Sequence, residues 1–226
     1  METLFSSIQQ VRDRIHQACL RAGRRPEDIL LVAVTKTLPE ERIQQALQEG
    51  LTHFGENYIQ EAQRKIETIR QGTWHFIGHL QSNKAKQALN LFSMIETVDS
   101  LKLARELNRQ ALQAGKTLEI LLQVNEAGEE SKSGLAADQI PCLLEESPTW
   151  QGLRLRGLMT IPPYDLDPEK SRPWYRSLSE QRARWQLQFP GLDLRHLSMG
   201  MSHDFEVAIE EGATIIRVGT ALFGAR

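Results

Sequence analysis

Apolar residues near the N-terminus recur every three or four positions, which is the spacing of one helical face. These positions are Leu4, Ile8, Val11, Ile15, Ala18 and Ala22. We predict a helix over residues 1–23, because Gly23 supplies a stop at its end. The next segment, 29–36, is a short continuous apolar run, which is typical of a parallel strand buried on both faces.

The same alternation continues along the rest of the chain. Further strands are predicted at 53–56, 73–78, 93–98, 117–125, 153–159, 193–199 and 214–219. Helices are predicted between them, at 39–50, 58–70, 82–91, 100–114, 136–146, 172–188 and 203–211.

This order favours an α/β fold in which a parallel sheet closes into a (β/α)8 TIM barrel. The N-terminal helix 1–23 then completes the helical ring. An open doubly wound sheet is the alternative, which is disfavoured because no G-x-G-x-x-G turn follows the first strand. We expect a single domain over residues 1–226.

The composition agrees with a soluble globular protein. Hydrophobic residues make up 40% of the 226 positions and charged residues 25%, and the formal net charge is −2. A charge so close to zero gives no electrostatic reason to expect nucleic acid or an anionic membrane as a partner. No apolar run approaches the ~18 residues of a membrane span, and the N-terminal segment is too polar for a targeting signal.

Neither the cysteines nor the histidines form a metal motif. Cys19 and Cys142 have no metal or redox spacing, which favours two thiols in a reducing cytoplasm. His75 and His79 lie four residues apart, but no third ligand accompanies them and their segment is predicted to be strand and loop. We therefore expect no metal site.

Lys36 stands at the end of the first predicted strand, where a barrel places its active face. Side chains alternate along a strand, so Val32, Val34 and Lys36 share one face. If that face points inward, an amine ends an apolar row at the barrel mouth. Partial loss of hydration there favours the neutral amine that forms an imine with a carbonyl. The alternative is a lysine that only marks the strand end and reaches solvent.

The loops after the last two predicted strands have the composition of a phosphate site. The first contains Ser198, Met199 and Gly200, and the second contains Gly219 and Thr220. Barrel proteins often bind phosphate between these two loops and a short additional helix. Glycines let backbone N–H groups approach an anion, and hydroxyls add donors.

For two other polar residues near strand ends, capping of a helix is the alternative to binding a ligand. Ser202 can cap the helix predicted at 203–211. Asn57, after the second strand, can donate to a cofactor oxygen or cap the next helix, and capping is the commoner role of such a residue.

Arg217 interrupts the last apolar strand. A buried arginine without a partner is costly, so an inward Arg217 must pair with a carboxylate or face a ligand. Glu56 and Glu119 are the candidate carboxylates for the first alternative.

A lysine opposite a phosphate site suggests that a phosphorylated aldehyde or ketone is bound as a Schiff base. A pyridoxal phosphate protein and an aldolase acting on a sugar phosphate both fit, and the residues considered one by one do not separate them.

Several long segments, which extend nearly from end to end, match one family in sequence and order. They are LVAVTKT, FGENYIQE, WHFIGHLQSNK, LLQVNEAGEESKSG, LRGLMTIPP, LSMGMSHDFEVAIEEG and RVGTALFG. By these motifs the chain resembles the pyridoxal phosphate homeostasis proteins, the YggS/PROSC family, and its many glutamines resemble those of cyanobacterial members. The resemblance implies a fold like the barrel domain of alanine racemase, with pyridoxal 5'-phosphate as the cofactor.

The resemblance also implies a role for each candidate residue. It places the cofactor as a Schiff base on Lys36, with Asn57 beside the ring and Arg217 near the ring nitrogen. Val34 and Ile77 pack under or around the ring. The implied phosphate contacts are Ser198, Met199, Gly200, Gly219 and Thr220.

An arginine near the ring nitrogen has a chemical consequence. The always-charged guanidinium of Arg217 disfavours protonation of that nitrogen, which makes the ring a poorer sink for carbanion electrons. This suits a racemase, and it equally suits a protein that performs no chemistry.

The chain length favours the protein that performs no chemistry over the racemase. Racemases and decarboxylases of this fold, as the family implies, add a second domain that brings an acid–base residue, whereas the predicted barrel ends at Phe223 with three residues remaining. We expect a non-catalytic, cytoplasmic carrier in pyridoxal phosphate (vitamin B6) and amino-acid homeostasis. A racemase-like enzyme of low activity is the alternative. Expected partners are the cofactor and, transiently, apoenzymes that use it, and the expected state is a monomer.

Overall fold

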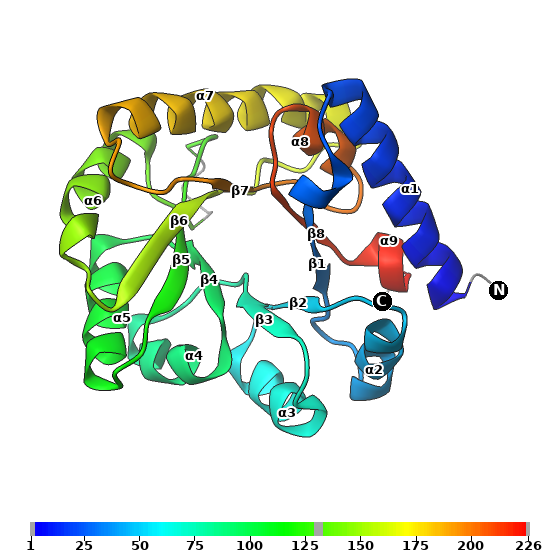
Figure 1. Cartoon of the computed structure of the whole chain (residues 1–226), viewed down its shortest axis with the longest axis horizontal. Helices are drawn as coiled ribbons and strands as arrows, with labels where there is room; N and C mark the ends of the chain where they lie inside the picture. The colour runs from blue at the N-terminus through cyan, green and yellow to red at the C-terminus, as the bar shows by residue number, and fades with distance from the viewer. Residues whose placement is uncertain (1–2, 129–132, 225–226) are drawn as a thin grey trace.

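Eight parallel strands form a closed barrel in the computed structural model, which describes residues 3–128 and 133–224 (Figure 1). The strands are β1 (Leu30–Val34), β2 (His53–Glu56), β3 (Thr73–Phe76), β4 (Met94–Val98), β5 (Leu118–Gln123), β6 (Leu153–Met159), β7 (His196–Ser198) and β8 (Ile215–Val218). Each pairs with the next one along the chain, and β8 closes the barrel on β1, with Arg217 opposite Val32. The (β/α)8 barrel predicted from the sequence is thus confirmed, and the open sheet is excluded.

Helices form the outer layer. They are α1 (Leu4–Ala22), α2 (Glu40–Gln48), α3 (Ile59–Ile69), α4 (Ala85–Leu91), α5 (Leu101–Gln113), α6 (Ile140–Glu146), α7 (Arg172–Gln188), α8 (Phe205–Glu210) and the short α9 (Thr220–Phe223). Single 3-10 turns lie at 26–28, 82–84, 137–139, 147–149 and 168–171. Within residues 3–128 and 133–224, no helix has the length and hydropathy to cross a membrane.

Six of the predicted strands are shorter than expected, by one to four residues, and a local reason is evident for the first and the seventh. The strand predicted at 29–36 ends at Val34, because the chain turns: Leu38 N–H donates to Thr35 O (3.1 Å) and Thr37 has a φ of 61°. The strand predicted at 193–199 begins only at His196. Before it, Leu194 N–H donates to the side chain of Gln186 in α7 instead of a strand (3.1 Å).

Apolar side chains pack in two layers, one between strands and helices and one inside the barrel. The interior cluster consists of Val32, Met94, Leu121, Met159 and Ile215, with Leu30 and Ile161 partly buried against it. Because these side chains fill the barrel, the space available to a ligand lies above them, at the strand ends.

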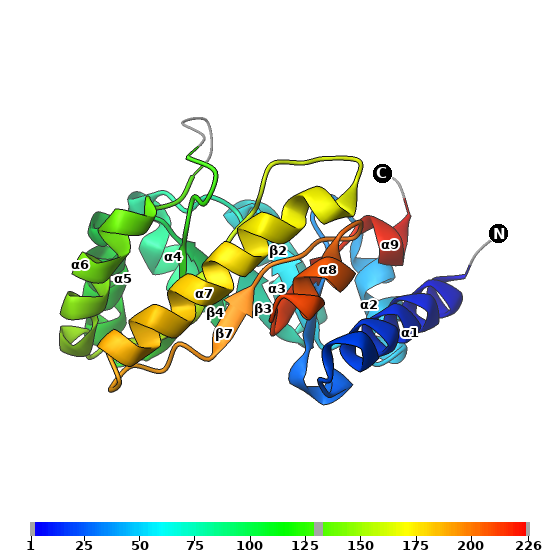
Figure 2. The same cartoon turned by 90° about the horizontal axis from the view of Figure 1, so that it is seen from above.

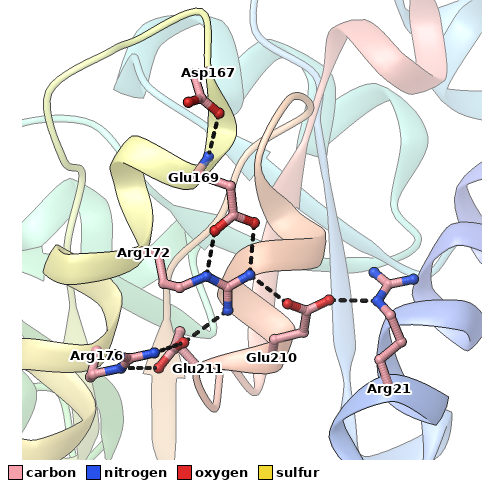
Figure 3. A network of polar contacts seen from close by, with 7 residues as sticks. All are labelled: Arg21, Asp167, Glu169, Arg172, Arg176, Glu210 and Glu211. Atoms are coloured by element: carbon pink, nitrogen blue, oxygen red, sulfur yellow. Dashed lines mark hydrogen bonds and ion pairs between the residues drawn. The ribbon is translucent and has the colours of Figure 1, made fainter.

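Ion pairs join α1, α7 and α8 on the outside of the barrel. α1 packs along α8 and α9 (Figures 1 and 2). Arg172 at the start of α7 contacts Glu210 (2.6 Å) and Glu211 (2.9 Å) at the end of α8, and Arg21 of α1 also contacts Glu210 (2.6 Å; Figure 3). This network fixes three helices around β7 and β8, whose loops carry the predicted phosphate contacts.

Candidate binding site at the barrel mouth

The predicted site residues all lie at or just beyond the carboxyl ends of five consecutive strands, β7, β8, β1, β2 and β3. Parallel strands place these ends on one face of the barrel, so the fold brings the residues to the same side. Figure 2 shows the loop that follows β6 projecting beyond the strands on one side. The residues are Val34, Lys36, Asn57, Ile77, Ser198, Met199, Gly200, Arg217, Gly219 and Thr220.

Lys36 lies in the turn after β1 and is half-buried. Val32, four residues earlier, belongs to the interior cluster, so the face that it shares with Val34 points into the barrel, as predicted. Val34 is buried at 8% exposure, one step nearer the mouth. The amine of Lys36 has no hydrogen-bond or ion-pair partner among the described residues. It is therefore available to a ligand.

A glycine in β2 shapes the apolar floor of the mouth. A Cβ atom at Gly55 would lie 2.8 Å from Ile77 Cδ1 and 2.9 Å from Val32 Cγ1. Ile77 and Val32 therefore pack directly on the backbone of Gly55, and both side chains stay low beneath the strand ends. Ile77 is 7% exposed, which agrees with a residue that packs under a ring.

Asn57 has a buried side-chain oxygen without a partner. The capping role suggested for it is wrong, because the N-cap of α3 is Tyr58 and no side chain caps that helix. The loop that carries Asn57 is in close backbone contact with the next loop, since a Cβ at Gly78 would meet the Asn57 carbonyl. Buried polar atoms normally have partners, so an unpaired one at the mouth indicates a place for a ligand.

Arg217 is buried, and its guanidinium spans two strand ends. Nη1 donates to Ser198 Oγ (2.6 Å) and Nη2 donates to Thr160 O (2.9 Å). Ser198 Oγ in turn donates to Glu96 Oε2 (2.5 Å), so the compensating carboxylate is one hydroxyl away. Burial lowers the pKa of Arg217, and the negative charge of Glu96 opposes that shift.

The carboxylates suggested as partners of Arg217 were wrong. Glu56 pairs with Lys65 (2.7 Å), and Glu119 pairs with Arg156 (2.8 Å). Neither pair includes Arg217, whereas Glu96, which interrupts the apolar β4, reaches it through Ser198. A carboxylate within an apolar strand is the sequence signal for such a partner.

A chain of polar contacts continues from Glu96 toward the far end of the barrel. Glu96 Oε1 contacts His75 Nδ1 (2.7 Å), and His75 Nε2 contacts His53 Nδ1 (3.0 Å). Burial works to raise the pKa of Glu96, but the hydrogen bond and charge of His75, the charge of Arg217 and the Ser198 hydroxyl hold it below its ordinary value. Burial, followed by the charge of His75, lowers the pKa of His53.

The two histidines of HFIGH thus point to different places. His75 belongs to the interior chain, whereas His79 lies at the surface of the mouth and contacts Asp99 Oδ2 (2.9 Å) and Ser133 Oγ (3.1 Å). Across the described parts of the chain, no three His, Cys, Asp or Glu side chains gather as metal ligands would.

Ser202 joins the two loops of the predicted phosphate site. Its Oγ accepts hydrogen bonds from Gly219 N–H (3.0 Å) and Ala221 N–H (3.2 Å), at the start of α9. Its predicted capping role is wrong, because the N-cap of α8 is Asp204. The Ser202 hydroxyl thus uses both N–H donors, and its own O–H, which has no acceptor among the described residues, can donate to an anion. The sequence contained Ser202 in the loop but did not show which donors it would meet.

The residues of the predicted phosphate site differ in whether their hydrogen-bonding groups already have partners within the protein. Ser198 Oγ is occupied by Arg217 and Glu96, and Met199 N–H donates to Ile215 O (3.1 Å). Gly200, Gly219 and Thr220 lie beyond the strands. Gly200 has a φ of 93° and a Cβ there would lie 2.6 Å from Ala208 Cβ, so only glycine allows this loop to rest on α8.

Comparison with known proteins gives matches over nearly the whole chain. The sequence profile of the family described as alanine racemase, N-terminal domain, matches residues 7–226. A protein of Aquifex aeolicus named pyridoxal phosphate homeostasis protein is 43% identical over 221 residues, which are 97% of this chain and 96% of that protein. The protein of the same name from Escherichia coli K12 is 40% identical, with 100% of this chain and 98% of that protein covered.

Solved structures are similar in fold. PipY of Synechococcus elongatus PCC7942, with PLP bound, superposes with a TM-score of 0.84 at 38% identity and covers 95% of this chain and 100% of its own. An alanine racemase of Clostridium difficile 630 superposes with a TM-score of 0.72 at 16% identity, with 95% of this chain and 55% of the racemase covered. The second likeness concerns the fold alone, and it confirms the barrel expected from the sequence.

Proposed function

The chain belongs to the pyridoxal phosphate homeostasis protein family, and from this premise we propose that it binds pyridoxal 5'-phosphate as a Schiff base on Lys36. The observation that carries the proposal is the amine of Lys36, which has no partner among the described residues and follows β1, while the unpaired oxygen of Asn57 follows the neighbouring β2. A PLP-bound structure of the similar protein PipY supports the choice of cofactor.

When bound, the cofactor would supply an aldehyde, and the amine of Lys36 would hold it as a Schiff base, with one water released. The reaction is reversible, so water or another amine releases the cofactor again. Val34 and Ile77 offer apolar surface for the ring, and Asn57 offers a polar atom beside it. Because Lys36 is half-buried, the cofactor can reach its amine, and water or another amine can reach the bound cofactor.

Arg217 is the proposed neighbour of the ring nitrogen. Its guanidinium is held by Ser198 and Thr160, so its position does not depend on the ligand. An always-charged group at this place disfavours a proton on the ring nitrogen, which weakens the cofactor as an electron sink.

The loops after β7 and β8 are the proposed phosphate site. Ser202 Oγ accepts from the N–H groups of Gly219 and Ala221, which fixes the hydroxyl so that its O–H can donate to an anionic oxygen. Gly200 and Thr220 complete the loop surface. Ser198 and Met199 remain proposed contacts, although their side-chain oxygen and N–H have protein partners.

We propose a carrier without catalysis, which acts in cytoplasmic pyridoxal phosphate and amino-acid homeostasis. Relatives that match along their whole length are named homeostasis proteins, whereas the match covers 55% of an alanine racemase. Both cysteines are free, which agrees with a reducing compartment. Apoenzymes that take the cofactor are the proposed transient partners, and a monomer is the proposed state.

An absorbance spectrum of the protein with pyridoxal phosphate, taken before and after borohydride, tests the proposal. We expect an imine band that borohydride removes, with the reduced cofactor located on Lys36 by mass spectrometry. Lys36→Ala should abolish the band and Lys84→Ala should leave it. Cofactor on another lysine of the wild-type protein contradicts the site. Sustained racemisation of an amino acid that Lys36→Ala abolishes contradicts the carrier role and favours a racemase-like enzyme.

A further inference from the structure

A second lysine lies fully buried beside the turn that carries Lys36. The side chain of Lys65, in α3, is 0% exposed. Its Nζ donates to Thr35 O (2.6 Å), Glu56 Oε1 (2.7 Å) and Glu61 Oε1 (2.6 Å). An ammonium group has three N–H donors, so these acceptors use all of them. Lys65 is thus a fixed, charged group within the wall of the barrel.

Both chain neighbours of Lys36 are held by this cluster. Thr35 accepts from Lys65 through its carbonyl and donates through its hydroxyl to Glu56 Oε1 (2.7 Å). Thr37 N–H donates to Glu61 Oε1 (2.5 Å). The backbone is therefore fixed on each side of Lys36, while the amine of Lys36 remains without a partner among the described residues.

The turn itself has a backbone conformation that requires such support. Thr37 has a φ of 61°, in the left-handed region that β-branched residues rarely adopt. A conformation of this kind persists where the surrounding contacts impose it. The hydrogen bond from Thr37 to Glu61, a residue that Lys65 also holds, is such a contact.

The faces of β1 and β2 explain how the cluster directs Lys36. Thr35 and Glu56 both meet α3, so their side chains leave the barrel on its outer surface. Lys36 is the next residue, half-buried in the turn just beyond the strand. Holding Thr35 outward therefore holds the turn that carries Lys36 at the mouth.

A buried lysine is not what packing alone favours. Replacing a buried ion pair by apolar side chains of similar size is often neutral or stabilising, so a charge here calls for another role. Burial also raises the pKa of Glu56, against the opposing hydrogen bond of Lys65. Burying these charged groups costs folding free energy, and the structural result of doing so is the fixed turn at Lys36.

We propose that Lys65 is a positioning residue for Lys36. It holds Thr35 directly and Thr37 through Glu61, so that the amine of Lys36 faces the mouth before the cofactor arrives. Lys65 does not itself take the aldehyde, because its donors are all bound within the wall. The inference rests on the proposed Schiff base at Lys36.

The test is a double variant, Glu56→Leu with Lys65→Met, which removes both buried charges together. Lys65→Met alone leaves Glu56 without its cation and is expected to fold poorly. In the double variant we expect the imine band to form about tenfold more slowly, because the amine is no longer prealigned. Amide hydrogen exchange over residues 35–38 should become faster, with little change in melting temperature.

A matched pair at Glu61 separates positioning from folding. Glu61→Gln keeps an acceptor for Thr37 and Lys65 and should retain the wild-type rate of imine formation. Glu61→Leu removes that acceptor and should slow it. Leu144→Ala, in the distant α6, should lower the melting temperature while leaving both the imine rate and the exchange of residues 35–38 unchanged.

The outcomes distinguish this inference from the proposed function. Absence of an imine in the wild-type protein contradicts the proposed function, and the exchange measurement, which needs no cofactor, then still decides the positioning. Wild-type protection of residues 35–38 in the double variant overturns the inference, and so does a wild-type rate of imine formation. Cofactor trapped on Lys65 also overturns it.

Discussion

The hydroxyl oxygen of Ser202, in the loop after β7, lies 3.0 Å from the backbone nitrogen of Gly219, in the loop after β8. The same oxygen accepts from Ala221 N–H at 3.2 Å. One side chain thus links two loops that are 17 residues apart in the sequence. Its own O–H has no acceptor among the described residues and can therefore donate to an anionic oxygen at the mouth.

Ser202→Ala tests this position. Under the proposed function, we expect the dissociation constant for pyridoxal phosphate to rise about tenfold, the effect of losing one charge-assisted hydrogen bond. The affinity for pyridoxal, which has no phosphate, should not change. A spectrophotometric titration with both compounds measures the difference. Ser147→Ala, which removes a buried hydroxyl far from the mouth, is the control, and equal losses for both compounds would contradict the assignment.

Glu96→Gln tests the compensation of Arg217. The variant keeps the size of the side chain but removes the negative charge that acts most strongly on the buried guanidinium. We expect the free energy of unfolding to fall by about 3 kcal/mol, because one partner of a buried charge pair is lost. Urea denaturation measures this value. Glu119→Gln, at the partly exposed pair with Arg156, should cost no more than about 1 kcal/mol. Similar losses in the two variants would refute the role of Glu96.

His53 predicts a loss of stability on mild acidification. Burial and the charge of His75 place its pKa below the ordinary value of 6.5, so the unfolded chain binds the proton more readily than the folded one. The contribution is present above pH 6.5 and is lost as the pH falls through the folded-state pKa. His53→Asn should therefore reduce the decline in melting temperature between about pH 7 and pH 5.

Two further histidines serve as comparisons for this pH dependence. Burial also lowers the pKa of His196, so His196→Asn should reduce the decline in the same direction. His16 is exposed on α1, and His16→Asn should leave the decline unchanged. A decline in His53→Asn as steep as in the wild-type protein would show that His53 does not contribute.

Arg172→Met tests the ion-pair network of Figure 3. Arg172 contacts Glu169, Glu210 and Glu211 and so joins the start of α7 to the end of α8. We expect the free energy of unfolding to fall by about 1 kcal/mol, with a smaller fall at high salt, since the network is partly exposed. Thermal denaturation at two salt concentrations measures it. Arg25→Met, at an exposed pair outside the network, should have no measurable effect.

Much of the fold followed from local patterns. The period of the apolar residues predicted each strand and every helix except the short α9, because that period depends only on which side of an element is buried. Residues 53–56, 153–159 and 172–188 were predicted with the bounds that the structure has. The ends of β1 and β7 were not, since hydrogen bonds of Thr35 and Gln186 decide them.

The sequence by itself determined the order of the elements, the place of Lys36 at a strand end and the composition of the two terminal loops. Only the tertiary structure decided which groups meet there. Glu96 reaches Ser198 across 102 residues of chain, and Lys65 reaches Thr35 across 30. Such contacts leave no periodic trace, because they depend on the closure of the barrel and on the direction of each side chain. The closure of the barrel therefore determines the hydrogen-bond partners of Arg217, of Ser202 and of the turn that carries Lys36.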